Sequence, residues 1–209
     1  MHTDYEMNII YQSKNQQFHL FNGEISYIFR VSGDGKLLHL YYGETLPDND
    51  YSHLIEMHHR PMSTYRNEND LLYSLEHLRQ EFPEYGTTDF RHPAISILQK
   101  NGSRLTDFVY IGHEIEDGKP RLEGLPATYV DRDSESKTLK VYLLDAITSI
   151  QVELLYTIYR DYPVITRSVR IINKGKESQI IENISSLSLD LPDADYEWQQ
   201  LSGAWGRER

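Results

Sequence analysis

The chain of 209 residues contains no cysteine, only two tryptophans and no long apolar run. Without cysteine, the protein can form no disulfide and no thiolate metal site, and it has no cysteine nucleophile. No stretch approaches the roughly 18 apolar residues of a membrane-spanning helix. The first residues also lack the basic region followed by an apolar one that marks a secretory signal peptide. These absences predict a cytoplasmic protein.

Basic clusters are missing as well. The 32 acidic residues outnumber the 21 lysines and arginines, so the formal net charge is −11. A protein that binds nucleic acid or an anionic membrane needs a basic face, so these partners are disfavoured, while neutral and cationic ligands stay open. With 39% hydrophobic and 25% charged residues, the composition is typical of a globular protein that can build a core.

Tyrosine is abundant, with 16 residues against six phenylalanines, and it favours strands. Residues 25–43 form two apolar runs around the turn residues "SGDG", which supply the positive φ of a tight hairpin. Apolar and polar residues then alternate over 137–145, 150–159 and 164–172. Residues 179–192 predict one more strand, with Leu187, Leu189 and Leu191 in phase.

The clearest alternation lies in residues 150–159. One face should point to the core, and it consists of Ile150, Val152, Leu154, Tyr156 and Ile158; the opposite face consists of Gln151, Glu153 and Thr157. Strands at short spacing without helices between them indicate antiparallel sheets with one packed and one solvated face. The sequence therefore predicts an all-β fold in which two such sheets stack as a β-sandwich, over a single domain.

One stretch, residues 67–82, resembles a helix. Leu71, Leu75 and Leu78 recur at helical spacing, Asp70 could cap the N-terminus, and Pro83 ends the pattern. A short strand over residues 71–75 is equally compatible with this sequence.

Motifs that carry chemistry are scarce. His58 and His59 are adjacent, so on a strand they would point to opposite faces, and no metal-binding histidine spacing occurs. There is no nucleophile elbow, phosphate loop or dinucleotide fingerprint. Paired carboxylates could serve glycoside hydrolysis, but the sequence does not single out a pair among 32. We expect no metal, no cofactor and no catalytic residue in this chain.

Three stretches are denser in polar and aromatic residues than a scaffold needs. They are residues 41–65, a long segment after a predicted strand; residues 81–95; and the final residues "YEWQQLSGAWGRER". Long loops inside a compact domain are usually functional or disordered. We expect at least one of the three to contact a ligand or another domain.

The same stretches carry a family resemblance. "PEYGTTDFR", with "LLHLYYGETLP" upstream and "LSGAWGRER" downstream, resembles the N-terminal domain of α-galactosidases of glycoside hydrolase family 36, of the bacterial, lactic-acid-bacterium or streptococcal type. The resemblance covers essentially the full chain. It implies a large, twisted, supersandwich-like antiparallel β-sandwich with at most one or two short helices. It also implies a catalytic (β/α)₈ barrel and a smaller β domain after Arg209.

The resemblance further implies a function for the whole enzyme, the retaining hydrolysis of terminal α-1,6-linked galactose from melibiose and raffinose-type sugars. Its two catalytic aspartates would lie on the barrel. The N-terminal domain would assist oligomer assembly, commonly a tetramer, and one of its loops would reach a neighbouring subunit's active site. Asp48 or Asp50, together with Arg60, fit the substrate-binding roles of that loop.

Two other interpretations stay open at this stage. The chain could be a stand-alone carbohydrate-binding β-sandwich that uses tyrosine and tryptophan as stacking platforms. It could also be a purely structural β-domain of an unrelated assembly. An open reading frame that continues for several hundred residues past Arg209 would favour the enzyme fragment over the stand-alone module, and a stop codon there would favour the module.

Overall fold

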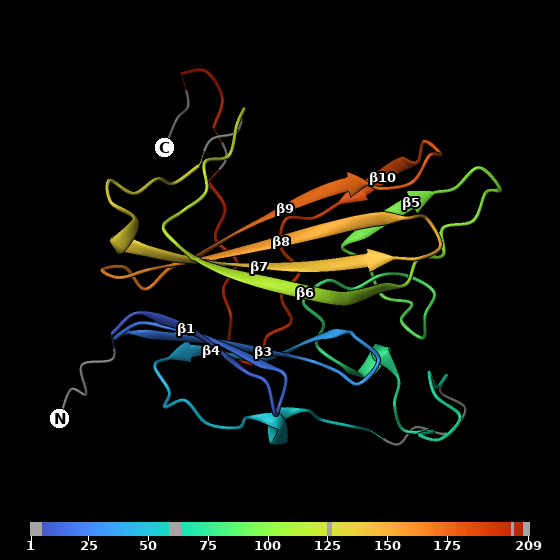
Figure 1. Cartoon of the computed structure of the whole chain (residues 1–209), viewed down its shortest axis with the longest axis horizontal. Coiled ribbons are helices and arrows are strands. Elements are labelled where there is room, and N and C mark those ends of the chain that lie inside the picture. Colours follow the sequence, from blue (N-terminus) through green and yellow to red (C-terminus); the bar gives the residue numbers. More distant parts are fainter. Residues whose placement is uncertain (1–5, 59–63, 125–126, 202, 207–209) are drawn as a thin grey trace.

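The computed structural model describes residues 6–58, 64–124, 127–201 and 203–206. These residues form β-strands and three single-turn 3₁₀ helices but no α-helix, as the all-β prediction requires. Two antiparallel sheets stack face to face, the β1–β4 sheet on one side and the β6–β9 sheet on the other (Figure 1). No helix among the described residues is long and apolar enough to cross a membrane.

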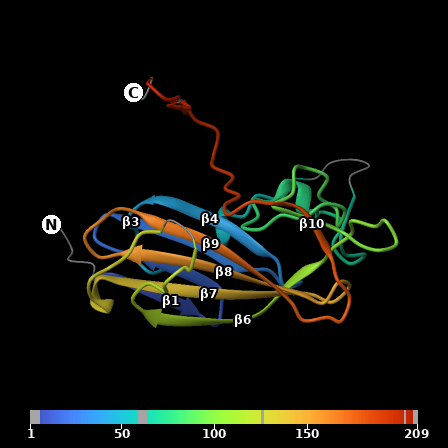
Figure 2. The same ribbon diagram turned by 90° about the horizontal axis from the view of Figure 1, so that it is seen from above.

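Both sheets follow the order of the chain, so each strand pairs with its sequence neighbour. The first sheet contains β1 (Asn8–Gln12), β2 (Gln17–Phe21), β3 (Ile25–Val31) and β4 (Leu37–Glu44). The second contains β6 (Phe108–Asp117), β7 (Ser136–Asp145), β8 (Ile150–Tyr159) and β9 (Ile165–Asn173). β5 (Ile95–Leu98) pairs with β10 (Ile180–Ile184) in a separate two-stranded sheet, which Figure 2 shows beyond one end of the sandwich. The 3₁₀ helices are η1 (Ser52–Leu54), η2 (Leu75–His77) and η3 (Asp133–Glu135).

The core lies between the two sheets, where the predicted alternation of β8 is confirmed. Its inward residues Ile150, Val152, Leu154, Tyr156 and Ile158 are all buried. The ring of Tyr156 stacks on Phe29 of the opposite sheet, with ring centroids 5.1 Å apart. Burial of apolar surface at about 25 cal/mol per Å² is the main stabilising contribution of this layer.

The first sheet is covered on its outer face as well. Residues 45–58 run along the side of β1–β4 that faces away from the second sheet (Figure 1). A small apolar cluster forms there, in which Leu38 of β4 packs with Leu75 and Leu78. Both faces of β2 are therefore buried.

The predicted helix over residues 67–82 is wrong. A bridge between Asn67 and Asp70 turns the chain, and the only regular element in this stretch is η2. Leu75 and Leu78 are buried against Leu38, but Leu71 is 61% exposed. The leucines therefore do not form one apolar stripe, and a helix there would have no continuous face to bury.

Two details of the strand predictions also need correction. β10 ends at Ile184, because its partner β5 has only four residues, and Leu187, Leu189 and Leu191 follow in a non-strand segment. Thr157 faces away from the core, but it is only 3% exposed. It lines a cavity together with Lys119, Pro120, Leu122, Ala127 and Thr128 of the connection between β6 and β7.

Candidate functional site

A row of polar side chains crosses the outer face of the first sheet. Gln12 of β1 lies opposite Gln17 of β2, which lies opposite Arg30 of β3. We call Gln12, Gln17 and Arg30 the outer polar row. Because strand side chains alternate between faces, these three point away from the core while their neighbours in sequence fill it.

The outer polar row binds the segment that follows β4. Gln12 Nε2 donates to Asp48 Oδ1 (2.6 Å) and Gln17 Nε2 donates to the carbonyl of Asn49 (2.8 Å). Gln17 Oε1 accepts from the backbone N–H of Tyr51 (2.9 Å). Arg30 Nη1 donates to Ser52 Oγ (2.7 Å). Successive parts of residues 48–52 are thus held by successive strands.

His19 of β2 lies beside this row and is fully buried. Its Nδ1 is 3.3 Å from Asp48 Oδ1, and its Nε2 is 2.9 Å from Ser26 Oγ. Burial lowers the pKa of His19 more than the Asp48 carboxylate raises it, so the ring is neutral. Since a carboxylate only accepts, Nδ1 carries the proton and donates to Asp48. Ser26 Oγ accepts from the N–H of Leu46 (2.9 Å) and can donate to Nε2.

The two predicted acidic site residues therefore lie on one anchored surface segment. The Asp48 side chain is 33% exposed, and only its Oδ1 is hydrogen-bonded within the described part of the chain. Asp50 is exposed, and its Oδ1 accepts from the N–H (2.9 Å) and hydroxyl (2.5 Å) of Ser52. These two bonds lower the pKa of Asp50. Arg60, the third predicted residue, lies outside the described residues, as does His59.

Other titratable groups of the same stretch are solvent-exposed. Glu56 and His58 are 3.6 Å apart and both largely exposed, which makes them a weakly stabilising surface pair. Across the described ranges, no three His, Asp or Glu side chains converge in a way that could hold a metal ion.

Residues 81–95, the second dense stretch, start with a buried carboxylate between the sheets. Glu81 is fully buried and accepts hydrogen bonds from Tyr27 and Tyr156 at 2.8 Å. His39 Nδ1 lies 2.8 Å and Arg167 Nη1 3.2 Å from the same carboxylate. Burial alone would raise the pKa of Glu81, but the contacts of His39, Arg167 and Tyr156 lower it overall.

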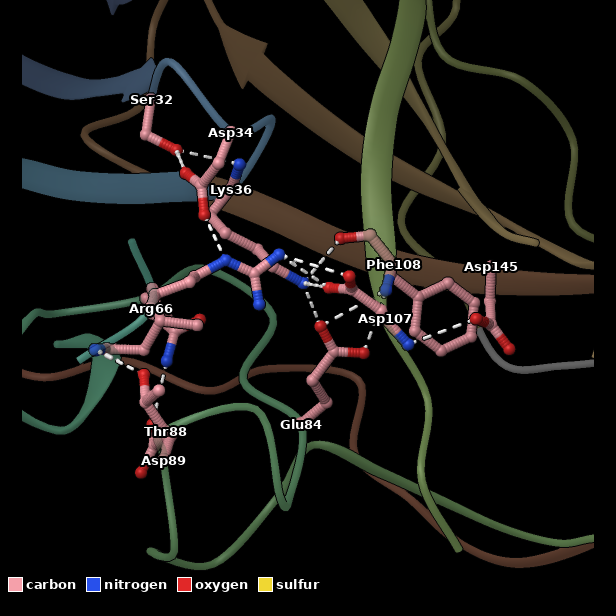
Figure 3. A network of polar contacts seen from close by, with 12 residues as sticks. Ser32, Asp34, Lys36, Arg66, Glu84, Thr88, Asp89, Asp107, Phe108 and Asp145 are labelled. Atoms are coloured by element: carbon pink, nitrogen blue, oxygen red, sulfur yellow. Dashed lines mark hydrogen bonds and ion pairs between the residues drawn. The ribbon is translucent and has the colours of Figure 1, made fainter. Parts of the chain in front are cut away.

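Glu84 forms a second buried group with Lys36, in the hairpin between β3 and β4 (Figure 3). Glu84 also accepts the N–H of Phe108 (2.9 Å), and Lys36 Nζ contacts the Phe108 carbonyl (2.8 Å) and Asp107 (2.7 Å). Burial raises the pKa of Glu84 to about 7, although the positive charge of Lys36 opposes this. The group joins the hairpin to the start of β6.

The polar residues of "PEYGTTDFR" mostly serve the fold. Asp89 is buried and accepts from Gln80 (2.7 Å), and Arg91 donates to Asp89 (2.8 Å) and to the carbonyl of Leu78 (2.8 Å). The motif's aromatic side chains Tyr85 and Phe90 are 49% and 53% exposed, and their rings meet edge to face with centroids 5.5 Å apart.

The third dense stretch is the end of the chain. Figure 2 shows its described part leaving the sandwich as an extended trace. Its described apolar side chains are exposed: Tyr196 (61%), Trp198 (89%), Leu201 (84%) and Trp205 (98%). Large apolar side chains so exposed in one segment are typical of a surface that another structure covers.

Gln12, Gln17 and His19 were not singled out from the sequence. A signal was present, because Phe18 and Leu20 alternate with Gln17 and His19 as on a strand. What the polar half of that pattern binds depends on a segment about 30 residues away, and no short-range pattern encodes that pairing.

Comparison with known proteins decides the family. The model of the glycosyl hydrolase family 36 N-terminal domain matches residues 35–209. The chain belongs to this family. The resemblance carried by "PEYGTTDFR" and "LSGAWGRER" is thereby confirmed, and so is the predicted antiparallel β-sandwich.

Members of the family 36 α-galactosidases align with nearly the whole chain. α-Galactosidase AgaA of Geobacillus stearothermophilus is 44% identical over 203 residues, which cover 97% of this chain and 28% of AgaA. The crystal structure of the α-galactosidase from Lactobacillus brevis matches with a TM-score of 0.91 at 35% identity, covering 96% of this chain and 27% of that protein. A structure of an AgaA variant in complex with raffinose matches with a TM-score of 0.87 at 45% identity, covering 92% and 27%. The chain thus spans little more than a quarter of these relatives.

Proposed function

We propose that this chain is the N-terminal, non-catalytic domain of an α-galactosidase that hydrolyses terminal α-1,6-linked galactose from melibiose and raffinose-type sugars. The observation that carries the proposal is the 44% identity to AgaA over 97% of this chain. The raffinose complex of the AgaA variant supports the same substrate class. The catalytic barrel and the C-terminal β domain would belong to the same polypeptide. That the enzyme works in the cytoplasm stays a prediction from the sequence.

The state of the buried carboxylates supports a non-catalytic role. A glycosidase needs two carboxyl groups that face a sugar across its glycosidic bond. Glu81 is enclosed by two tyrosines, a histidine and an arginine, and Glu84 by Lys36 and the Phe108 N–H. Neither carboxylate faces solvent, so neither can reach a glycosidic bond.

The anchored segment after β4 suits a binding role in trans. In the assembled oligomer, which we expect to be a tetramer, Asp48 or Asp50 and Arg60 would contact the part of the substrate beyond the terminal galactose in a neighbouring subunit. Carboxylates and a guanidinium form charge-assisted hydrogen bonds with sugar hydroxyls. The exposure of Asp50 and the free Oδ2 of Asp48 among the described residues are compatible with such contacts.

The exposed tail suits contact with the catalytic barrel. Tyr196, Trp198, Leu201 and Trp205 would be buried there, which explains why the segment is so apolar without packing on the sandwich. A stand-alone carbohydrate-binding module is less well supported. The exposed aromatic pair Tyr85 and Phe90 meets edge to face with planes 83° apart, so the two rings do not present one flat stacking surface.

The test compares the full-length protein with residues 1–209 alone. Purified full-length protein should hydrolyse an aryl α-galactoside and release galactose from raffinose, while the 209-residue chain should do neither. The proposal fails if the full-length protein is inactive on both substrates. Its non-catalytic part fails if the 209-residue chain turns over substrate and an Asp or Glu substitution within it abolishes that turnover.

A further inference from the structure

Two buried polar residues lie on the outer face of β2, where apolar residues of similar size would cost less free energy to bury. Gln17 and His19 of β2 are both completely buried. Burial of an amide or imidazole costs free energy unless every polar atom is hydrogen-bonded. Both side chains meet this condition, and they meet it mainly with one target, the segment of residues 46–52.

The contacts divide the work between the two residues. Gln17 binds backbone on either side of Asp50, at the Asn49 carbonyl (2.8 Å) and the Tyr51 N–H (2.9 Å). His19 binds the Asp48 side chain through Nδ1. Its Nε2 contacts Ser26 Oγ, and the same oxygen accepts a hydrogen bond from the Leu46 N–H. Gln17 therefore fixes the path of the chain, and His19 fixes the direction of one carboxylate.

We propose that Gln17 and His19 are positioning residues, which hold Asp48 and Asp50 in the orientation that a sugar in the neighbouring subunit requires. The inference rests on the proposed function, because it concerns the same substrate contacts. Neither residue touches the sugar, since neither is exposed. Each acts on Asp48 or on the backbone beside Asp50.

His19 orients Asp48 by donating a hydrogen bond to the Oδ1 atom of Asp48. The N–H donors of Gln12 and His19 both point at this oxygen, at 2.6 and 3.3 Å, which leaves Oδ2 as the acceptor that can receive a sugar hydroxyl. A carboxylate held by two donors in the free enzyme loses little rotational freedom on binding, so the interaction with substrate is stronger. Without His19, Asp48 would retain one donor and more freedom.

A pair of substitutions separates the two nitrogens of His19. In His19→Asn the side-chain amide nitrogen replaces Nδ1 and can still donate to Asp48, whereas His19→Gln reaches toward Ser26 and loses the Asp48 contact. Gln17→Leu removes both backbone contacts at similar volume. Thr157→Val is the matched control, because Thr157 is also a buried polar residue on an outer face, hydrogen-bonded to Thr138 (2.8 Å), but it lies on the second sheet, away from this segment.

The variants are to be made in the full-length protein and assayed on raffinose and on an aryl α-galactoside. We expect His19→Gln and Gln17→Leu to raise KM for raffinose about tenfold, the effect expected when the sugar loses one hydrogen bond to a carboxylate of this segment, with kcat within about twofold. KM for the aryl substrate should stay unchanged. His19→Asn should have a KM for raffinose near the wild-type value. Thr157→Val should leave KM unchanged for both raffinose and the aryl substrate.

Hydrogen–deuterium exchange provides a readout that does not depend on activity. Peptides covering residues 46–52 should exchange faster in His19→Gln and Gln17→Leu than in wild type and Thr157→Val. Equal exchange in all four proteins would overturn the positioning role. Faster exchange with unchanged raffinose KM would also overturn it, because the held segment would then not serve the substrate. A wild-type enzyme without α-galactosidase activity would instead overturn the proposed function.

Discussion

Replacing Glu81 by glutamine should be among the most destabilising single changes in this domain. The substitution keeps the volume but removes the charge that faces Arg167, whose side chain is only 5% exposed. It also places an N–H₂ group among donors, since Tyr27, Tyr156 and Arg167 all donate to this carboxylate. Loss of one partner from a buried ion pair costs about 3–5 kcal/mol, mainly because the other charge stays buried and unpaired.

A double-mutant cycle tests whether this is the cause. Arg167→Met leaves Glu81 with its tyrosine and histidine partners, and Glu81→Gln with Arg167→Met removes both charges. We expect the double variant to be less destabilised than the sum of the single variants, by at least about 2 kcal/mol. Urea unfolding should be followed by far-UV circular dichroism, because Trp198 and Trp205 lie in the exposed tail and would report poorly on the core.

The pH dependence gives a second measurement of the same group. The folded-state pKa of Glu81 lies below its ordinary value of 4.5, so the unfolded chain binds the proton more readily. The stabilisation from this group is therefore present above about pH 4.5 and is lost as the pH falls through the folded-state pKa. Wild type should lose more stability than Glu81→Gln on acidification. The reasoning is refuted if the single variants are additive or if Glu81→Gln costs less than about 1 kcal/mol.

Three further predictions concern the core, the hairpin and Glu84. Leu154→Ala should cost about 2–5 kcal/mol in unfolding free energy by urea titration, whereas Leu187→Ala, at a half-exposed position, should change it by less than about 0.5 kcal/mol; equal costs would contradict the core assignment. Gly35→Ala should destabilise by about 1–3 kcal/mol, because Gly35 has φ +82° and a new Cβ would lie 3.1 Å from Val109 Cβ. Gly33→Ala, with nothing within 4 Å, should be nearly neutral, and a reversed order of the two melting temperatures would show the hairpin geometry to be wrong. The folded-state pKa of Glu84, about 7, lies above its ordinary 4.5, so wild type should lose about 3 kcal/mol relative to Glu84→Gln as the pH rises from 4.5 to 7; parallel stability profiles would exclude this shift.

The sandwich itself could be predicted from local pattern. In β8, five apolar side chains at every second position are enough to assign both the strand and its buried face. The hairpin between β3 and β4 could also be predicted, because "SGDG" separates two apolar runs. Alternation works here because a strand in a two-layer fold has one apolar environment and one polar environment.

The wrong predictions for residues 67–82 and for Thr157 share one physical cause, the segments that cover the outer faces of the sheets. Leu71, Leu75 and Leu78 have the spacing of a helix face, but Leu75 and Leu78 pack individually on Leu38. Thr157 was expected to face solvent, but the connection between β6 and β7 covers it. From the sequence, the candidate site could be predicted only as a polar loop that contains Asp48 and Asp50. The residues that hold this loop, Gln12, Gln17 and His19, belong to strands earlier in the chain.

The alternation of β2 has a consequence for how such a domain can evolve. Phe18 and Leu20 contribute to the core, while Gln17 and His19, each one residue away, hold the segment of residues 46–52. Mutations at Phe18 and Leu20 therefore act on the stability of the fold, whereas mutations at Gln17 and His19 act on the conformation of the loop. If this segment contacts the substrate as we propose, a lineage that exchanges Gln17 and His19 together with the loop would change its sugar preference while Phe18 and Leu20 stay constant. In β2, the positions that build the core and the positions that hold the loop can therefore vary independently of each other.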